Sequence, residues 1–349
     1  MILKNDQLID LLSFDPIENF DSDNLEHLVE LNKKSIKSIS ISRGVLPRIP
    51  PFEQHPYLEP LTIDCEKTGL MIGTFPPISY LCDTLKLNQL KFRNQTISPP
   101  DLPYFHGNYA SLWKYAPIDF NQIIKEDRSL QPNLIKLQLR SRGVIYTDII
   151  KYCQRQLDIK NEDEKYTASD KLLKNIVIND DVYNYLINNQ SINRIYFTNS
   201  SFFSTNNFLF DKNSNLRLQE NDAFGLFLKG ANDRGIKIDV SLPNNPENWI
   251  NLNEGNKTKP FLQDINDKLL LKVYLNLRLS NGELIRKFQI CSTVSPAAVN
   301  RGMVRQNQCV KNYSRIQNCP IPVSPEKLLR LVLMEFFNDN LANIQQYNA

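Results

Sequence analysis

Short apolar runs that end in glycine, proline or small polar residues recur along this chain. The first run covers residues 69–73 and is stopped by Thr74-Phe75-Pro76-Pro77. Two runs of the same kind cover residues 143–147 and 194–198. Such runs are typical of buried strands that open into tight loops, so the pattern predicts three core strands.

The intervening stretches favour helices and one hairpin. Residues 169–189 carry apolar positions at helical spacing, which predicts one or two helices, and a shorter helix is expected around 111–116. Residues 269–293 are interpreted as a β-hairpin with Asn281-Gly282 at its turn, because this dipeptide readily adopts positive φ angles. A last helix is expected to begin with Ser324 as N-cap and Pro325 at its first position.

Strands that alternate with helices imply a parallel sheet with right-handed crossovers. We therefore expect an α/β fold, with three αβα layers around a central, mostly parallel four-stranded sheet. This domain is expected to span residues 67–349, with an insertion at about 204–285 that includes the added first strand of the hairpin. Residues 1–66 are interpreted as a helical and loop extension with a proline-broken connector.

Composition narrows the choice of partners. The 41 Lys and Arg residues nearly balance the 38 Asp and Glu residues, which excludes a histone-like or tail-driven binder. A nucleic-acid site must then come from local clustering of charge. The chain shows neither a secretion signal nor an apolar run that could span a bilayer, so we expect a cytoplasmic protein of bacterial type, close to the nucleoid.

The six cysteines are scattered and form no C-x-x-C pair. We therefore expect reduced, mostly buried thiols, no metal site and no cofactor.

Ligands of open parallel sheets bind beyond the carboxyl ends of the strands. The residues expected there contain no His and no phosphate-binding glycine motif, which disfavours nucleoside triphosphate and dinucleotide chemistry. A serine hydrolase is also disfavoured, because no His partner is present at these ends. His55 and His106 have Pro or Gly neighbours and are interpreted as surface or loop residues.

The stretch from Ile285 to Pro325 contains no Asp or Glu. It carries six basic residues: Arg286, Lys287, Arg301, Arg305, Lys311 and Arg315. A basic, acid-free stretch after a sheet strand predicts a surface for DNA phosphates. The alternative is a solvated basic face without a ligand.

Four segments resemble motifs of the uracil-DNA glycosylase superfamily. The resemblance is closest to the branch of hypoxanthine-DNA glycosylases and mismatch-specific glycosylases. These segments are IGTFPP with PYFHGNYASLWKYAP, GVIYTDIIKYCQRQ, RIYFTNSS and STVSPAAVNR, and they occur in the family's order over about Gly69–Arg305. The resemblance implies a glycosylase that acts as a monomer on duplex DNA with an extruded base. It is expected to be monofunctional, because no Lys lies at a strand end to form a Schiff base.

The resemblance also implies site residues. The expected base pocket comprises Thr74, Phe75, Pro76, Phe105 and Asn199. The expected catalytic positions are Asn108, Asp148 and Thr293. The closing loop would enter the minor groove and bind DNA through Ser295, Asn300, Arg301 and Arg305.

The chain departs from the family at three catalytic positions. Phe75 stands where many members carry Asp or Asn, and Thr293 stands where many carry His. The branch's Asn is replaced by Ala110, and Asn108 is the nearest amide. Either Asp148 and Asn108 carry out catalysis instead of the family's residues, or the protein is an inactive DNA-binding or DNA-sensing module.

Asp148 bears on the choice of base. An ionised carboxylate favours the exocyclic amine of adenine or cytosine, including a modified cytosine, whereas a protonated one can donate to a carbonyl of uracil or hypoxanthine. Asp148 could also cap a following helix.

Overall fold

The computed structural model of the chain describes residues 43–48, 50, 52–62, 68–105, 112–160, 163–167, 169–198, 222–242, 245–252, 274–282, 284–292, 296 and 324–338. Within these residues, no helix combines the length and the apolar character needed to cross a membrane.

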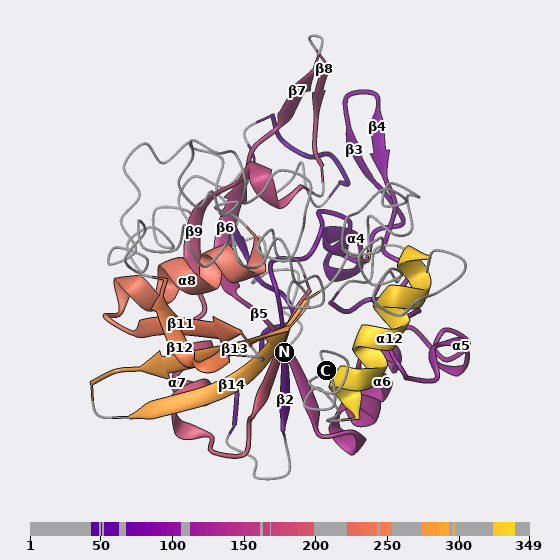
Figure 1. The fold of residues 1–349 in the computed structure, drawn as a ribbon. Helices are drawn as coiled ribbons and strands as arrows, with labels where there is room; N and C mark the ends of the chain where they lie inside the picture. The colour runs from indigo at the N-terminus through magenta and orange to yellow at the C-terminus, as the bar shows by residue number, and fades with distance from the viewer. Residues whose placement is uncertain are drawn as a thin grey trace.

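A seven-stranded mixed sheet with the order β12-β11-β13-β14-β10-β2-β5 forms the centre of the molecule (Figure 1). Four neighbouring strands are parallel: β14 (Ile285–Cys291), β10 (Arg194–Phe197), β2 (Gly69–Gly73) and β5 (Val144–Asp148). Antiparallel strands extend the sheet beyond β14: β13 (Tyr274–Ser280), β11 (Lys237–Leu242) and β12 (Asn245–Asn251). The α/β class is confirmed, and the sheet is larger than the four strands expected.

Helices cover both faces of this sheet. The helices are α4 (Tyr80–Thr84), α5 (Phe120–Ile123), α6 (Gln131–Ser141), α7 (Asp181–Asn188), α8 (Ala223–Asp233) and α12 (Pro325–Phe337). Tyr196 and Phe197 are consecutive on β10 and so point to opposite faces. Tyr196 packs on Phe336 of α12, whereas Phe197 packs on Phe224 and Phe227 of α8. On the edge of the sheet, α6 packs against β5.

Smaller sheets lie around the carboxyl ends of the parallel strands. One sheet has the order β1-β6-β9, formed by Phe52–Gln54, Ile150–Arg155 and Leu173–Ile178. Two hairpins, β3–β4 (Leu90–Phe92 and Gln95–Ile97) and β7–β8 (Asp158–Lys160 and Asp163–Lys165), project from the molecule beyond α4 (Figure 1).

Several expected elements differ from the structure. Residues 173–178 form β9 rather than helix, because they pair with β6 and end in the β-branched run Ile176-Val177-Ile178. Residues 112–118 form turns instead of the short helix. Asp148 is followed after one residue by β6, so the expectation that it caps a helix is wrong.

The expected insertion and the expected N-terminal extension also form parts of the packed structure. Residues 222–251, placed in the insertion, form α8, β11 and β12. The expected extension supplies β1, which pairs with β6. The predicted hairpin and last helix are confirmed: Gly282 has a φ of 94°, and Ser324 accepts a hydrogen bond from the Lys327 N–H at 3.1 Å.

Candidate functional site

The order of the parallel strands creates a switch point at β2. The chain passes from β2 to β5 on one side and then returns to β10 on the other side. In open α/β sheets, ligands bind outside the carboxyl ends of the strands at such a point. At the end of β2, a Cβ on Gly73 would lie 2.1 Å from the Tyr146 hydroxyl and 2.3 Å from Asp148 Oδ1. Only glycine therefore lets these two polar groups approach the strand.

A buried polar network surrounds Asp148. His55 Nε2 lies 2.9 Å from Asp148 Oδ2, and the Tyr146 hydroxyl donates to Asp148 Oδ1 at 3.1 Å. The backbone N–H of Tyr57 donates to His55 Nδ1 at 3.1 Å. Because Nδ1 accepts this bond, the ring proton sits on Nε2 and is donated to Asp148.

Burial sets the protonation of this network. It holds the pKa of His55 below its ordinary value of 6.5, although the neighbouring Asp148 works in the opposite direction. Burial also raises the pKa of Tyr146 well above its ordinary value. A neutral imidazole and a neutral phenol therefore both donate to Asp148 at neutral pH.

Aromatic rings enclose this network. The His55 ring is 5.2 Å from the ring of Phe75 and 5.1 Å from that of Phe105, measured between centroids. The Phe105 ring is in turn 4.6 Å from that of Tyr146. Both phenylalanines are buried, so they contribute packing surface on two sides of the imidazole.

A second buried network anchors the loop after β2. Arg155 donates to Glu53 Oε1 at 2.8 Å and to the Pro76 carbonyl at 2.6 Å, and it lies over the Phe75 ring. Tyr80 donates to the other Glu53 oxygen at 2.5 Å. Burial disfavours the charged guanidinium, but Glu53, Cys153 and Tyr80 together raise the pKa of Arg155 above its ordinary value. The charged pair thus fixes the backbone that carries Phe75.

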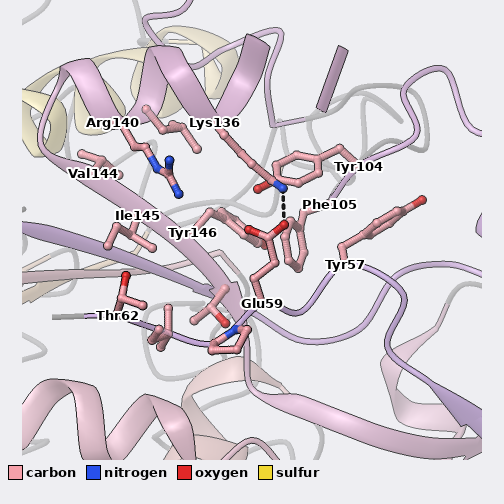
Figure 2. A pocket seen from close by; sticks show the side chains of 14 residues that line it. Tyr57, Glu59, Thr62, Tyr104, Phe105, Lys136, Arg140, Val144, Ile145 and Tyr146 are labelled. Atoms are coloured by element: carbon pink, nitrogen blue, oxygen red, sulfur yellow. Dashed lines mark hydrogen bonds and ion pairs between the residues drawn. The ribbon is translucent and has the colours of Figure 1, made fainter. Parts of the chain in front are cut away.

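A cavity of about 240 Å³ adjoins the first network, between α6 and β5 (Figure 2). Its aromatic walls are Tyr57, Tyr104, Phe105 and Tyr146, and its charged residues are Glu59, Lys136 and Arg140. Glu59 and Lys136 form an ion pair at 2.5 Å, with the Lys136 ammonium 5.8 Å from the Tyr104 ring. The cavity therefore combines stacking surfaces with a charged mouth.

Glu59 is the one carboxylate among the described residues that line this cavity. Burial alone would raise its pKa, but the hydrogen bond and charge of Lys136 lower the pKa below the ordinary value. Glu59 is thus ionised at neutral pH and can accept a proton.

The structure brings together part of the expected site. Phe75, Phe105 and Asp148 meet around His55, while Pro76 and Thr74 lie in the adjoining loop. The Thr74 hydroxyl donates to Asp170 at 2.9 Å and is thereby held outside the network. The other expected site residues lie outside the described residues: Asn108, Asn199, Thr293, Ser295, Asn300, Arg301 and Arg305.

His55 and Arg286 make internal contacts that the sequence did not indicate. His55 is buried at 3% exposure rather than placed on the surface. No alternation indicates this burial, because the strand ends at Gln54, residues 56–57 form a turn, and Pro56 and Tyr57 are buried as well. Arg286 of the acid-free stretch donates to the carbonyls of Asn189 and Ile192 at 2.7 and 2.9 Å, so it ties down the end of α7.

In the described part of the chain, no cluster of three or more His, Cys, Asp or Glu side chains could hold a metal ion. Cys82, Cys153 and Cys291 are free and buried. Comparison of the chain with protein-family models, curated proteins and solved structures gave no match.

Proposed function

We propose that this chain is a DNA glycosylase-like protein that takes an extruded base into the cavity beside β5 and hydrolyses its N-glycosidic bond. One observation carries the proposal: Phe105 and Tyr146 contact the His55–Asp148 network on one side and line the aromatic cavity on the other. Pockets for flipped bases stack the base between such rings.

The fold supports the same proposal. The adjacent parallel strands β14, β10, β2 and β5 would correspond to the expected four-stranded core, flanked by helices in three layers. Strands β13, β11 and β12 would then be additions to a glycosylase-like domain. The cavity runs along β5 from Val144 to Thr147, and Asp148 at the carboxyl end of the strand holds the Tyr146 side chain that lines it.

Glu59 and Lys136 of the cavity supply the proton acceptor and the proton donor for hydrolysis. Glu59 accepts a proton from water as the water oxygen forms a bond to C1′ of the deoxyribose. The C1′–N bond breaks, its electron pair leaves with the base, and the base nitrogen takes a proton from Lys136. Transfer of the proton from Glu59 to Lys136 across their 2.5 Å contact restores the pair. Asp148 has a positioning role, since it holds His55 and Tyr146 behind the cavity wall.

The test is base release from duplexes that carry one uracil, hypoxanthine or modified cytosine, scored by strand scission after alkali treatment. We expect release from one of these duplexes and a fall in kcat of about 100-fold or more in Glu59→Gln. The matched control is Glu247→Gln, which removes an exposed carboxylate on β12 and should keep full activity. Activity that survives Glu59→Gln unchanged would reject the assigned chemistry, and no release from any duplex would reject the glycosylase.

A second candidate function is a DNA-binding or DNA-sensing module without catalysis. It is favoured by the hydrogen bonds at Asp148, because His55 and Tyr146 each donate to one carboxyl oxygen and so compete with a base for this acceptor. This candidate predicts that a duplex with an extruded base binds more tightly than a fully paired one, with no release of base over hours. Equal binding of the two duplexes would rule it out.

A further inference from the structure

A cationic surface lies on the β3–β4 hairpin and the segment beside it. Arg43, Arg48, Lys91 and Arg93 are all exposed there, and we refer to these four residues as the hairpin cation face. Residues 43–50 and 84–100 contain no Asp or Glu. These two segments therefore carry only positive charge, in a chain whose total charge is nearly balanced, and the Glu164 carboxylate that contacts the face comes from β8.

Backbone pairing places these cations on one side of a small sheet. Lys91 N donates to the Gly44 carbonyl at 2.6 Å, and Leu46 N donates to the Lys91 carbonyl at 2.8 Å, so residues 44–46 run alongside β3. Leu46 and the neighbours of Lys91 point into the core, whereas Val45 and Lys91 point outward. Arg43 and Arg93 continue the outward rows at two-residue spacing.

A single carboxylate orients two of the four cations. Glu164 on β8 forms ion pairs with Arg48 at 3.1 Å and with Arg93 at 2.6 Å. The Glu164 side chain is 13% exposed, whereas those of Arg48 and Arg93 are 74% and 44% exposed. Glu164 thus fixes the direction of both guanidinium groups and leaves them accessible to a second anion.

The backbone at the hairpin tip holds one of the four cations in a conformation that costs free energy. Arg93 has a φ of 51°, in the left-handed region that suits glycine or asparagine. A residue with a Cβ pays about 1–2 kcal/mol there. Strain of this kind concentrates at binding and catalytic sites.

We infer that the hairpin cation face binds the phosphate backbone of duplex DNA. Four accessible cations, two on a projecting β-ribbon and two on the segment beside it, match a polyanion in charge, and a ribbon of this width can follow a groove. The described residues of these two segments expose one large apolar side chain, Val45, and Ile159 is exposed opposite Glu164 on the neighbouring hairpin. Two apolar side chains on different segments do not make the continuous apolar face that insertion into a lipid surface needs. The choice of DNA over RNA rests on the proposed function, whereas phosphate binding stands without it.

The test is the affinity of the full chain for undamaged duplex DNA as a function of salt. The variant carries Arg43→Gln, Arg48→Gln, Lys91→Gln and Arg93→Gln. The control carries four neutralisations at exposed residues elsewhere: Lys125→Gln, Lys174→Gln, Lys229→Gln and Lys237→Gln. We expect the variant to bind at least about 30-fold more weakly at 0.1 M salt, with a salt slope shallower by about 3. The control should keep the slope.

Other outcomes would overturn the inference. An equal loss in both quadruple variants would mean that only total charge matters. Tighter binding to duplex RNA or to vesicles of anionic lipid than to duplex DNA would assign the face to another partner. Because the duplex is undamaged and no base is released, the result is independent of whether the chain proves to be a glycosylase.

The single substitution Arg93→Gly distinguishes weaker DNA binding from loss of folding. Arg93→Gly removes one cation and relieves the left-handed strain, so we expect unchanged or higher thermal stability together with a salt slope shallower by about 1. The stability measurement confirms that the variant is folded. A stable Arg93→Gly protein that binds DNA as the parent does would remove Arg93 from the face.

Discussion

The parallel end of the sheet at β2 and β5 buries both members of its polar pairs, whereas the antiparallel wing of β11, β12 and β13 leaves one member partly exposed. In the wing, Leu275, Leu277 and Leu279 alternate with partly exposed residues, and the partly exposed Arg278 donates to the buried Asp239 at 2.6 Å. At the parallel end, all of Gly69–Gly73 is buried, and ionisable side chains are drawn inside with it.

The fully buried pairs at the parallel end are not explained by their contribution to stability. A buried ionisable group destabilises the fold unless a partner satisfies it, and an apolar pair of the same size is often at least as stable. In the wing, Arg278 keeps 28% of its side chain exposed and so stays partly solvated while it pairs with Asp239. The parallel end instead holds Glu53 with Arg155 and His55 with Asp148, side by side around Phe75. Packing does not require these pairs, which is why we place the functional site at this end.

The largest effect should come from breaking the buried ion pair. Arg155→Met leaves the Glu53 carboxylate without its cation at 0% exposure, so we expect a loss of about 3–5 kcal/mol in the free energy of unfolding. Arg234→Met on α8, beside the wing, removes an ion pair with Asp180 whose side chains are 29% and 62% exposed, and should cost no more than about 1 kcal/mol. Urea unfolding of both variants measures the difference.

The double variant Glu53→Gln with Arg155→Met sharpens this comparison. It removes both charges, so it should be less destabilised than the sum of the two single variants. Strict additivity, or equal losses for Arg155→Met and Arg234→Met, would show that the pair at the parallel end is no different from an exposed one.

Two glycines offer a smaller contrast of the same kind. In Gly73→Ala the new methyl group meets Tyr146 and Asp148, so we expect a loss of about 3 kcal/mol. In Gly235→Ala, next to β11, the methyl group meets no atom within 4 Å, and only the backbone φ of 66° opposes it, at about 1 kcal/mol. Thermal unfolding compares them. A Gly73→Ala protein as stable as Gly235→Ala would mean that the polar network shifts easily and is not pre-organised.

Local signals made part of this architecture predictable. The continuous apolar runs at β2 and β10 indicated strands buried on both faces, and Asn281-Gly282 indicated the β13–β14 turn. The Ser324-Pro325 pair indicated the start of α12. In each case, neighbouring residues alone determine the structure.

The remaining features depend on contacts between distant segments. The 173–178 segment has helical spacing, but pairing with β6 makes it a strand. His55 lies 93 positions from Asp148, and Glu59 lies 77 positions from Lys136. Nothing in the residues next to His55 or Glu59 reveals these partners, so both were missed although Phe75, Phe105 and Asp148 were identified.

Acid titration gives the smallest and most selective effect. The wing between residues 222 and 292 contains no histidine, and His55 is the one histidine among the described residues. Burial holds the pKa of His55 below 6.5 in the folded protein, and the unfolded chain takes up the proton more readily. Stability from neutral His55 is therefore complete above about pH 6.5 and is lost as the pH falls below it, by at most about 1.4 kcal/mol per pH unit.

His55→Gln isolates this titration, because the glutamine amide can still donate to Asp148 but cannot take up a proton. We expect the free energy of unfolding to decrease more steeply in the parent than in the variant between about pH 7 and pH 5. Carboxylates titrate in both proteins, so they cancel in the difference. Parallel pH profiles would mean that folded His55 is as easily protonated as an exposed histidine, which a ring enclosed by Phe75, Phe105 and Tyr57 does not allow.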